Sequence, residues 1–110
     1  LMGHSEGGMA VAKSAHPEFA GKIISGWTCI NPLYPNYDGI YSPKNLPILA
    51  IAYVDDEWRK GKPTEGRCAD KAEGRINFKQ IDLNGWFHNT YGNAEARRGV
   101  KEFLNQYQTK

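Results

Sequence analysis

Gly3-His4-Ser5-Glu6-Gly7 is the stretch of this 110-residue chain that decides its fold. It is a G-x-S-x-G pentapeptide, which predicts a sharp turn from a strand into a helix, with the serine held in a strained backbone conformation. Bulky side chains two residues before or two residues after that serine would clash in such a turn. Gly3 and Gly7 stand at those positions, so we expect Ser5 at the tip of the turn.

Hydrophobic periodicity predicts the elements that follow. The segment 47–54 is apolar on both faces, which is typical of a central parallel strand covered by helices. The segment 76–83 alternates apolar and polar residues, which favours a place near the edge of a sheet. A short helix is expected over 9–15 and a further strand over 22–27. Because long connections separate the strands, the order strand, helix, strand, strand, strand, helix predicts an α/β fold with a parallel sheet.

The last helix is predicted by its cap and by its own apolar stripe. Asn93 is a good N-cap for a helix over Ala94–Tyr107. Five apolar side chains recur there at helical spacing and form one apolar stripe: Ala96, Val100, Phe103, Leu104 and Tyr107. The connecting segments lack such periodicity. We therefore expect an ordered loop over 28–45, and a polar loop over 55–75 with one helical turn near 70–73.

Composition limits the class of protein. Hydrophobic residues make up 40% of the chain and charged residues 24%, as in an ordinary globular protein, and the length allows at most one domain over 1–110. The formal net charge is +2 and the basic residues are scattered, so no nucleic acid is expected as a partner. No long apolar run predicts a membrane span, and no membrane partner is expected.

The two cysteines, Cys29 and Cys68, fit no metal-binding spacing, so neither a metal nor a cofactor is expected. Both lie in predicted loops on the same side of the sheet, where they could form a disulfide or stay as two buried thiols. A disulfide would close a loop of about forty residues, which the chain-entropy model values at about 2–4 kcal/mol. It would favour a periplasmic or secreted location, whereas free thiols would favour the cytoplasm.

Each predicted strand delivers a distinctive residue at its carboxyl end, the edge at which open parallel sheets bind ligands. The first strand ends at Ser5, the central apolar strand runs into Asp55 and Asp56, and the last strand is followed by His88. These residue types suit acyl transfer. In that reaction a serine attacks a carbonyl, a histidine takes the proton of the serine hydroxyl, and an aspartate orients the histidine ring. The main-chain N–H of Glu6 would then stabilise the developing oxyanion.

Three segments carry a family resemblance: 3–10, 45–51 with the Asp56-Glu57-Trp58 that follows, and Gly85-Trp86-Phe87-His88. With the chain order Ser, Asp, His, they resemble the α/β-hydrolase superfamily, and within it the dienelactone hydrolase-like branch. The resemblance covers essentially the whole chain. It implies that residues 1–110 form the C-terminal half of a single α/β-hydrolase domain, with a mostly parallel sheet flanked by helices.

The resemblance favours Asp56 over Asp55 as the acid, because the family's apolar strand commonly ends in Gly-x-x-Asp. Tyr53 stands here where the family has that glycine, whereas Gly85 and His88 match the family's Gly-x-x-His segment directly. Dienelactone hydrolases proper use a cysteine nucleophile, and this chain has a serine. The resemblance therefore implies a carboxylic-ester hydrolase that needs no cofactor and acts on a small-molecule ester or related acyl compound.

Two other functions stay open at this point: a serine peptidase similar to prolyl oligopeptidases, and a non-catalytic binding member or inactive fragment of the fold. Only Leu1 and Met2 precede the pentapeptide, and Leu1 is not an initiator methionine. We therefore expect the chain to need an N-terminal half, which in the family supplies the second oxyanion donor. The isolated 110-residue segment is expected to be inactive.

Aromatic residues fall at or just beyond the carboxyl ends of the predicted strands. Trp27, Trp58 and the pair Trp86 and Phe87 could form the rim of an apolar acyl pocket, or could pack as ordinary loop residues. His4, directly before the serine, is expected to pack or hydrogen-bond beneath the turn rather than to react. The sequence therefore predicts one site, at the edge of the sheet where the strands end.

Overall fold

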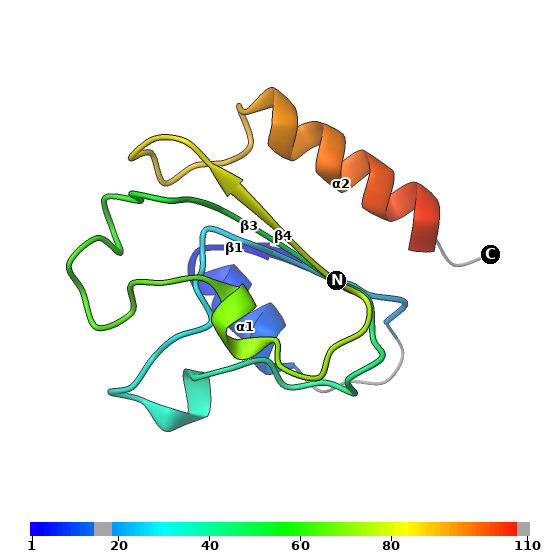
Figure 1. Ribbon diagram of the computed structural model, residues 1–110, viewed down its shortest axis with the longest axis horizontal. Coiled ribbons are helices and arrows are strands. Elements are labelled where there is room, and N and C mark those ends of the chain that lie inside the picture. Colours follow the sequence, from blue (N-terminus) through cyan, green and yellow to red (C-terminus); the bar gives the residue numbers. More distant parts are fainter. Residues whose placement is uncertain (15–18, 108–110) are drawn as a thin grey trace.

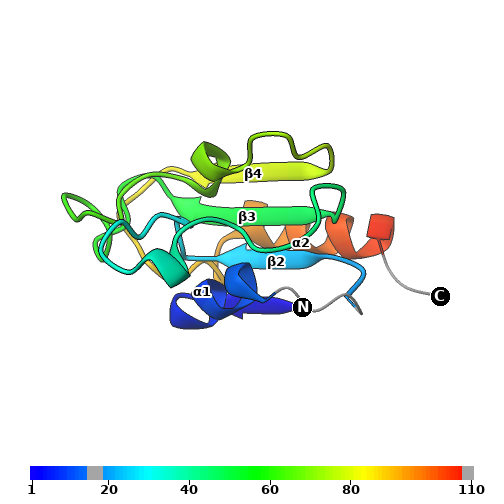
Figure 2. The same ribbon diagram turned by 90° about the horizontal axis from the view of Figure 1, so that it is seen from below.

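The computed structural model describes residues 1–14 and 19–107 as a four-stranded sheet with helices on both faces. All strands pair in parallel and lie side by side in chain order: β1 (Met2–His4), β2 (Lys22–Ser25), β3 (Ile48–Tyr53) and β4 (Phe78–Leu83). The helices α1 (Glu6–Lys13) and α2 (Ala94–Tyr107) cover opposite faces (Figure 1 and Figure 2). The predicted parallel α/β arrangement is therefore confirmed. The expected end of the first helix, Ala15, lies outside the described residues.

The central strand β3 forms the core on both sides of the sheet. Its side chains alternate between the two faces, so that Ile48 and Ala50 pack on the α1 side, and Leu49 and Ile51 on the α2 side. None of the four is more than 1% exposed. This burial on both faces explains why the segment is apolar throughout, as expected for a covered parallel strand.

The two edge strands differ in how well they are covered. In β4, Ile81 is buried and Asp82 is exposed, which confirms the predicted alternation. Beside β1, an apolar groove of about 600 Å³ runs along α2 and includes Met2 and Leu104. Leu104 belongs to the apolar stripe predicted for the last helix, yet it is 51% exposed. The reason is that α2 packs on β3 and β4, which leaves its flank toward β1 uncovered.

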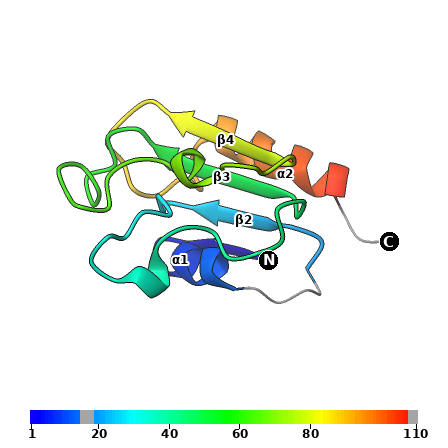
Figure 3. The ribbon, with the colours of Figure 1, turned by 60° about the horizontal axis from the view of Figure 1, so that its bottom comes forward.

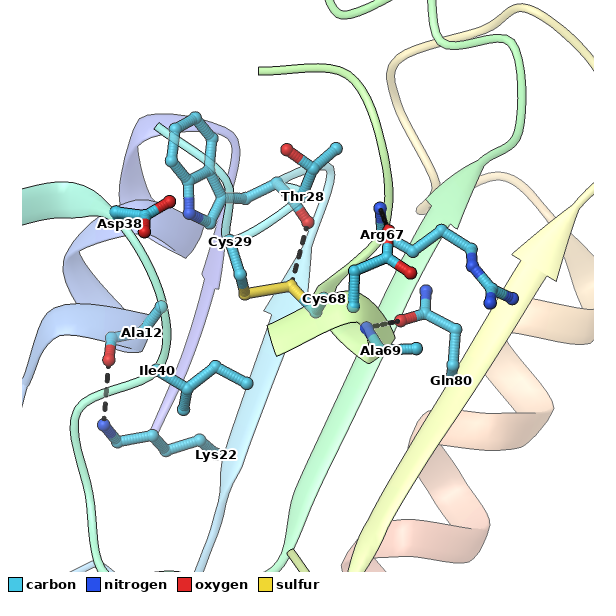
Figure 4. The surroundings of a disulfide bond; sticks show 12 residues. Ala12, Lys22, Thr28, Cys29, Asp38, Ile40, Arg67, Cys68, Ala69 and Gln80 are labelled. Atoms are coloured by element: carbon cyan, nitrogen blue, oxygen red, sulfur yellow. Dashed lines mark hydrogen bonds between the residues drawn. A yellow bond between two sulfur atoms is a disulfide. The ribbon is translucent and has the colours of Figure 1, made fainter. Parts of the chain in front are cut away.

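Long loops leave the carboxyl ends of the strands and gather on one side of the sheet (Figure 3). A buried disulfide between Cys29 and Cys68 joins the loop after β2 to the loop after β3 (Figure 4). The sequence left open whether the two cysteines form a disulfide or stay as thiols, and the structure contains the disulfide. The helical turn expected near 70–73 lies two residues earlier, at Cys68–Lys71, because the Asp70 carboxylate accepts the main-chain N–H of Arg67 and sets its start.

A buried lysine closes the end of α1. The Lys22 ammonium donates hydrogen bonds to the main-chain oxygens of Ala12, Ser14 and Tyr41. Figure 4 shows the bond to Ala12. The first two oxygens lie at the C-terminal end of α1, where the helix dipole favours a positive charge. No carboxylate within ion-pair distance balances this charge among the described residues. Burial, helped by repulsion from Arg75, lowers the pKa of Lys22 to about 8.

No helix within residues 1–14 and 19–107 is long and apolar enough to cross a lipid bilayer.

Lys22 makes stability depend on alkaline pH. Its pKa in the folded protein, about 8, lies below the usual lysine value of about 10.4, so the unfolded chain binds more protons between these values. The free energy of unfolding should therefore gain a rising contribution above pH 8. The variant Lys22→Met keeps the apolar stem and should lose this rise. Urea denaturation of both proteins at several values between pH 7.5 and 9.5 measures the difference, and parallel pH profiles would contradict the assignment.

Candidate active site

Ser5 lies at the turn between β1 and α1 with a positive φ of 56° and a ψ of −117°, a strained backbone conformation that non-glycine residues rarely adopt. Its N–H donates to the main-chain oxygen of Ser25 at 2.8 Å. A Cβ added to Gly3 would lie 2.2 Å from the Gly7 oxygen, so glycine is required at that position. The expectation of a clash at Gly7 is wrong, since a Cβ there meets nothing within 4 Å. Gly7 instead contributes the backbone that crowds Gly3.

His88 and Asp56 form a hydrogen-bonded pair on the loops that follow β4 and β3. The Nδ1 atom of His88 lies 2.7 Å from Oδ2 of Asp56. Asp56 is only 3% exposed, and its other oxygen accepts the main-chain N–H of Trp58 at 2.8 Å. Asp55 is exposed and pairs with Lys60 instead. Of the two adjacent aspartates, Asp56 is therefore the one that contacts the imidazole.

Ser5 and His88 line the same cavity, which has a volume of about 870 Å³. Its walls include the aromatic side chains of Trp27 and Trp58, two of the four that the sequence suggested for a pocket. Trp58 also lies close to the histidine, with 5.8 Å between the ring centroids. Ser5, His88 and Asp56 come from three different strand ends, and the fold brings them to one side of the sheet.

Trp86 and Phe87, the other two residues that the sequence suggested, are not among the residues that line this cavity. Their side chains are 59% and 52% exposed, and their rings stack on each other with centroids 4.7 Å apart. The cause lies in the backbone of their loop. The main-chain oxygens of Gly85 and Trp86 accept the N–H groups of Asp55 and Glu57, so the two loops run side by side and turn these rings outward.

Glu6 is the first residue of α1, where the main-chain N–H groups have no partner within the helix. Its N–H donates to no other described residue, and Glu6 lines the cavity next to Ser5. The N–H of Glu6 is therefore an available hydrogen-bond donor at the positive end of the α1 dipole, a position that stabilises a developing negative charge.

Arg59 lines the cavity and was not anticipated from the sequence. Its guanidinium lies over the Trp27 ring, 4.7 Å from the centroid. Burial lowers the pKa of Arg59, while the charges of Asp56 and Glu6 act in the opposite direction. Its Nε atom is buried without a hydrogen-bond partner in the described part of the chain. Arg59 follows Asp56 by three residues in the same loop, and this short spacing is the signal from which its place near the site could have been inferred.

His4 packs beneath the site, as the sequence suggested. Its Nδ1 atom lies 2.8 Å from the Ser25 hydroxyl, and its ring centroid is 4.9 Å from that of His88. Burial lowers the pKa of His4, repulsion from His88 lowers it further, and Asp56 partly opposes both. A neutral His4 can therefore support His88 without adding a positive charge to the site.

No group of three or more His, Cys, Asp or Glu side chains within the described ranges could hold a metal ion.

His4 should titrate below the usual histidine pKa of about 6.5. As the pH falls below about 6.5, His4 binds a proton in the unfolded chain before it does so in the folded protein. Protonation of His4 therefore lowers the free energy of unfolding on acidification. Asp56→Asn removes the charge that raises the pKa of His4 and should lower its midpoint further. Nuclear magnetic resonance of the ring protons measures both midpoints. A His4 midpoint at or above 6.5 would show that the ring is more hydrated than the structure indicates.

Comparisons with known proteins give no family for this chain: no protein-family model matches it, and no curated protein matches it.

Proposed function

We propose that this chain carries the reactive centre of a serine hydrolase that cleaves carboxylic esters through an acyl-enzyme. The observation that carries the proposal is the convergence of two features on one cavity. Ser5 is held in a strained turn at the start of a helix, and the His88 ring is fixed by the buried carboxylate of Asp56. A strained serine that shares a cavity with an oriented imidazole supports this proposal, because an imidazole that reaches a serine hydroxyl activates it for attack on a carbonyl.

The proposed reaction uses the ring nitrogen of His88 that does not contact Asp56 and the main-chain N–H of Glu6. Asp56 engages Nδ1 of His88, which leaves Nε2 to take the proton as the Ser5 hydroxyl attacks the ester carbonyl. The main-chain N–H of Glu6 donates to the negatively charged oxygen of the tetrahedral intermediate. Collapse of the intermediate expels the alcohol, which receives the proton from His88. Water, deprotonated by the same nitrogen, then attacks the acyl group and releases the acid and the serine.

The finer fold assignment belongs to the same proposal. The resemblance to α/β-hydrolases is supported by the parallel order β1 to β4 and by the strained serine between β1 and α1. In that fold an N-terminal half would pair with the free edge of β1, cover the apolar groove beside α2 and supply a second oxyanion donor. The disulfide Cys29–Cys68 supports an oxidising compartment, either the periplasm or the outside of the cell.

Ser5→Ala should lower kcat for p-nitrophenyl ester hydrolysis by the full-length protein by at least about 10³-fold, because the nucleophile is removed. A fluorophosphonate probe should label Ser5 in the unmodified protein. Ser42→Ala is the matched control, since the Ser42 hydroxyl is buried and has no hydrogen-bond partner among the described residues. The control should keep both turnover and labelling. Peptide mapping that places the label elsewhere, with turnover surviving Ser5→Ala, would rule out the proposed nucleophile.

Adjacent aspartates provide a second test of the mechanism. Asp56→Asn should lower kcat by about 10⁴-fold, because the ring loses the carboxylate that sets its tautomer. Asp55→Asn removes an exposed charge that only pairs with Lys60, so it should change kcat by less than about twofold. Steady-state kinetics of the two variants decide between them. Equal losses, or a larger loss for Asp55→Asn, would overturn the role given to Asp56.

A further inference from the structure

Ser25, the last residue of β2, holds the two segments that carry Ser5 and His88. Its main-chain oxygen accepts the N–H of Ser5 at 2.8 Å. Its hydroxyl lies 2.5 Å from the hydroxyl of Thr90, which follows His88 by two residues. Ser25 and Thr90 are 0% and 2% exposed, so water does not compete for these bonds. One buried residue therefore connects the strained serine turn to the histidine loop.

His4 makes the second contact to the same hydroxyl, with its Nδ1 atom at 2.8 Å. We call His4, Ser25 and Thr90 the hydroxyl clasp. A serine hydroxyl donates one hydrogen bond and can accept others, so it satisfies both neighbours while His4 is neutral. His4 directly precedes Ser5 and its ring lies against that of His88. The clasp thus reaches the site along two routes, through the backbone before Ser5 and through the loop after His88.

The clasp rests on parts of the structure that leave it little freedom to adjust. Gly26, next to Ser25, has φ +65°, and a Cβ there would lie 2.5 Å from Cε1 of His4. The N–H of Gly26 donates to the oxygen of Ile51 in β3 at 2.8 Å. On the other side, the oxygen of Thr90 accepts the N–H of Asn93, whose side chain caps α2. Both ends of the clasp are therefore fixed to regular elements.

We propose that Ser25 and Thr90 are positioning residues, whose hydrogen bond sets the separation between the Ser5 hydroxyl and the His88 ring. The proposal rests on the proposed function. Neither residue lines the cavity that holds Ser5 and His88, so neither is placed to touch a substrate. Loss of their hydrogen bond should therefore lower kcat and leave KM unchanged. Proton transfer requires the two groups at hydrogen-bond distance, and a shift of about 1 Å can cost about 10²-fold in rate.

The first test compares three single variants in the full-length protein by steady-state kinetics. Thr90→Val keeps the shape and removes the hydroxyl, and it should lower kcat by about 10- to 100-fold with KM unchanged. Thr90→Ser restores the hydroxyl and should bring kcat to within about threefold of the unmodified protein. Thr28→Val is the matched control, since Thr28 is 3% exposed and its hydroxyl donates to the oxygen of Thr64 without contacting either segment.

Thr28→Val loses a buried hydrogen bond too, so it should reduce thermal stability while kcat stays within about twofold. Ser25→Ala combined with Thr90→Val should be no slower than the slower single variant, because both changes break the same bond. If Thr28→Val lowers kcat as much as Thr90→Val, the effect is general loosening and the proposal is wrong. Additive losses in the double variant would equally overturn it.

A second measurement separates this proposal from the proposed function. In nuclear magnetic resonance spectra, Thr90→Val should shift the Ser5 amide signal and the ring signals of His88, whether or not the protein turns over an ester. Unchanged signals at both residues would refute the clasp even in an active enzyme. Shifted signals in a protein that hydrolyses no ester would support the clasp and refute the proposed function.

Discussion

The close passage of α1 over the end of β1 is the constraint on which the site depends. The turn between them can form only because Gly3 has no Cβ, since any side chain there would collide with the backbone at Gly7. The same turn places Ser5 in a backbone conformation that most residues avoid and brings the N–H of Glu6 to the cavity. Strain of this kind persists only where its surroundings hold it, and here Ser25 in the neighbouring strand does so.

The architecture could be predicted well from the sequence, because burial leaves a periodic trace. The segment 47–54 has no polar face, and this property alone identifies a covered central strand. Periodicity indicates which side of an element is apolar, but not how far its neighbour extends. For this reason the sequence shows Leu104 as part of an apolar stripe, but not that α2 leaves that flank open beside β1. The burial of Lys22 could not be predicted from the sequence, because its hydrogen-bond partners are main-chain oxygens, which every residue type has.

The candidate site could be predicted in part. Chain order and strand-end placement selected Ser5, Asp56 and His88, and the structure places the first and last on one cavity and the second against the imidazole. The choice between adjacent aspartates depends on the direction of a loop, which no local pattern encodes. The same limit applied to Trp86 and Phe87, whose orientation is set by main-chain hydrogen bonds to another loop. Single hydroxyls at strand ends, such as Ser25, carry no recognisable motif at all.

The disulfide has a consequence for how this site could diversify. It joins the loops after β2 and β3, and the Cys68 sulfur lies 3.3 Å from the main-chain oxygen of Trp27 on the cavity wall. The parts of these loops at 31–38 and 59–66 contribute side chains to the cavity, among them Asn31, Tyr34 and Arg59. Substitutions of these side chains would reshape the cavity without replacing His88 or Asp56. Under the proposed function, the cross-link would keep the two loops joined while the side chains between them varied, so that related chains could admit different compounds to the same pair of His88 and Asp56.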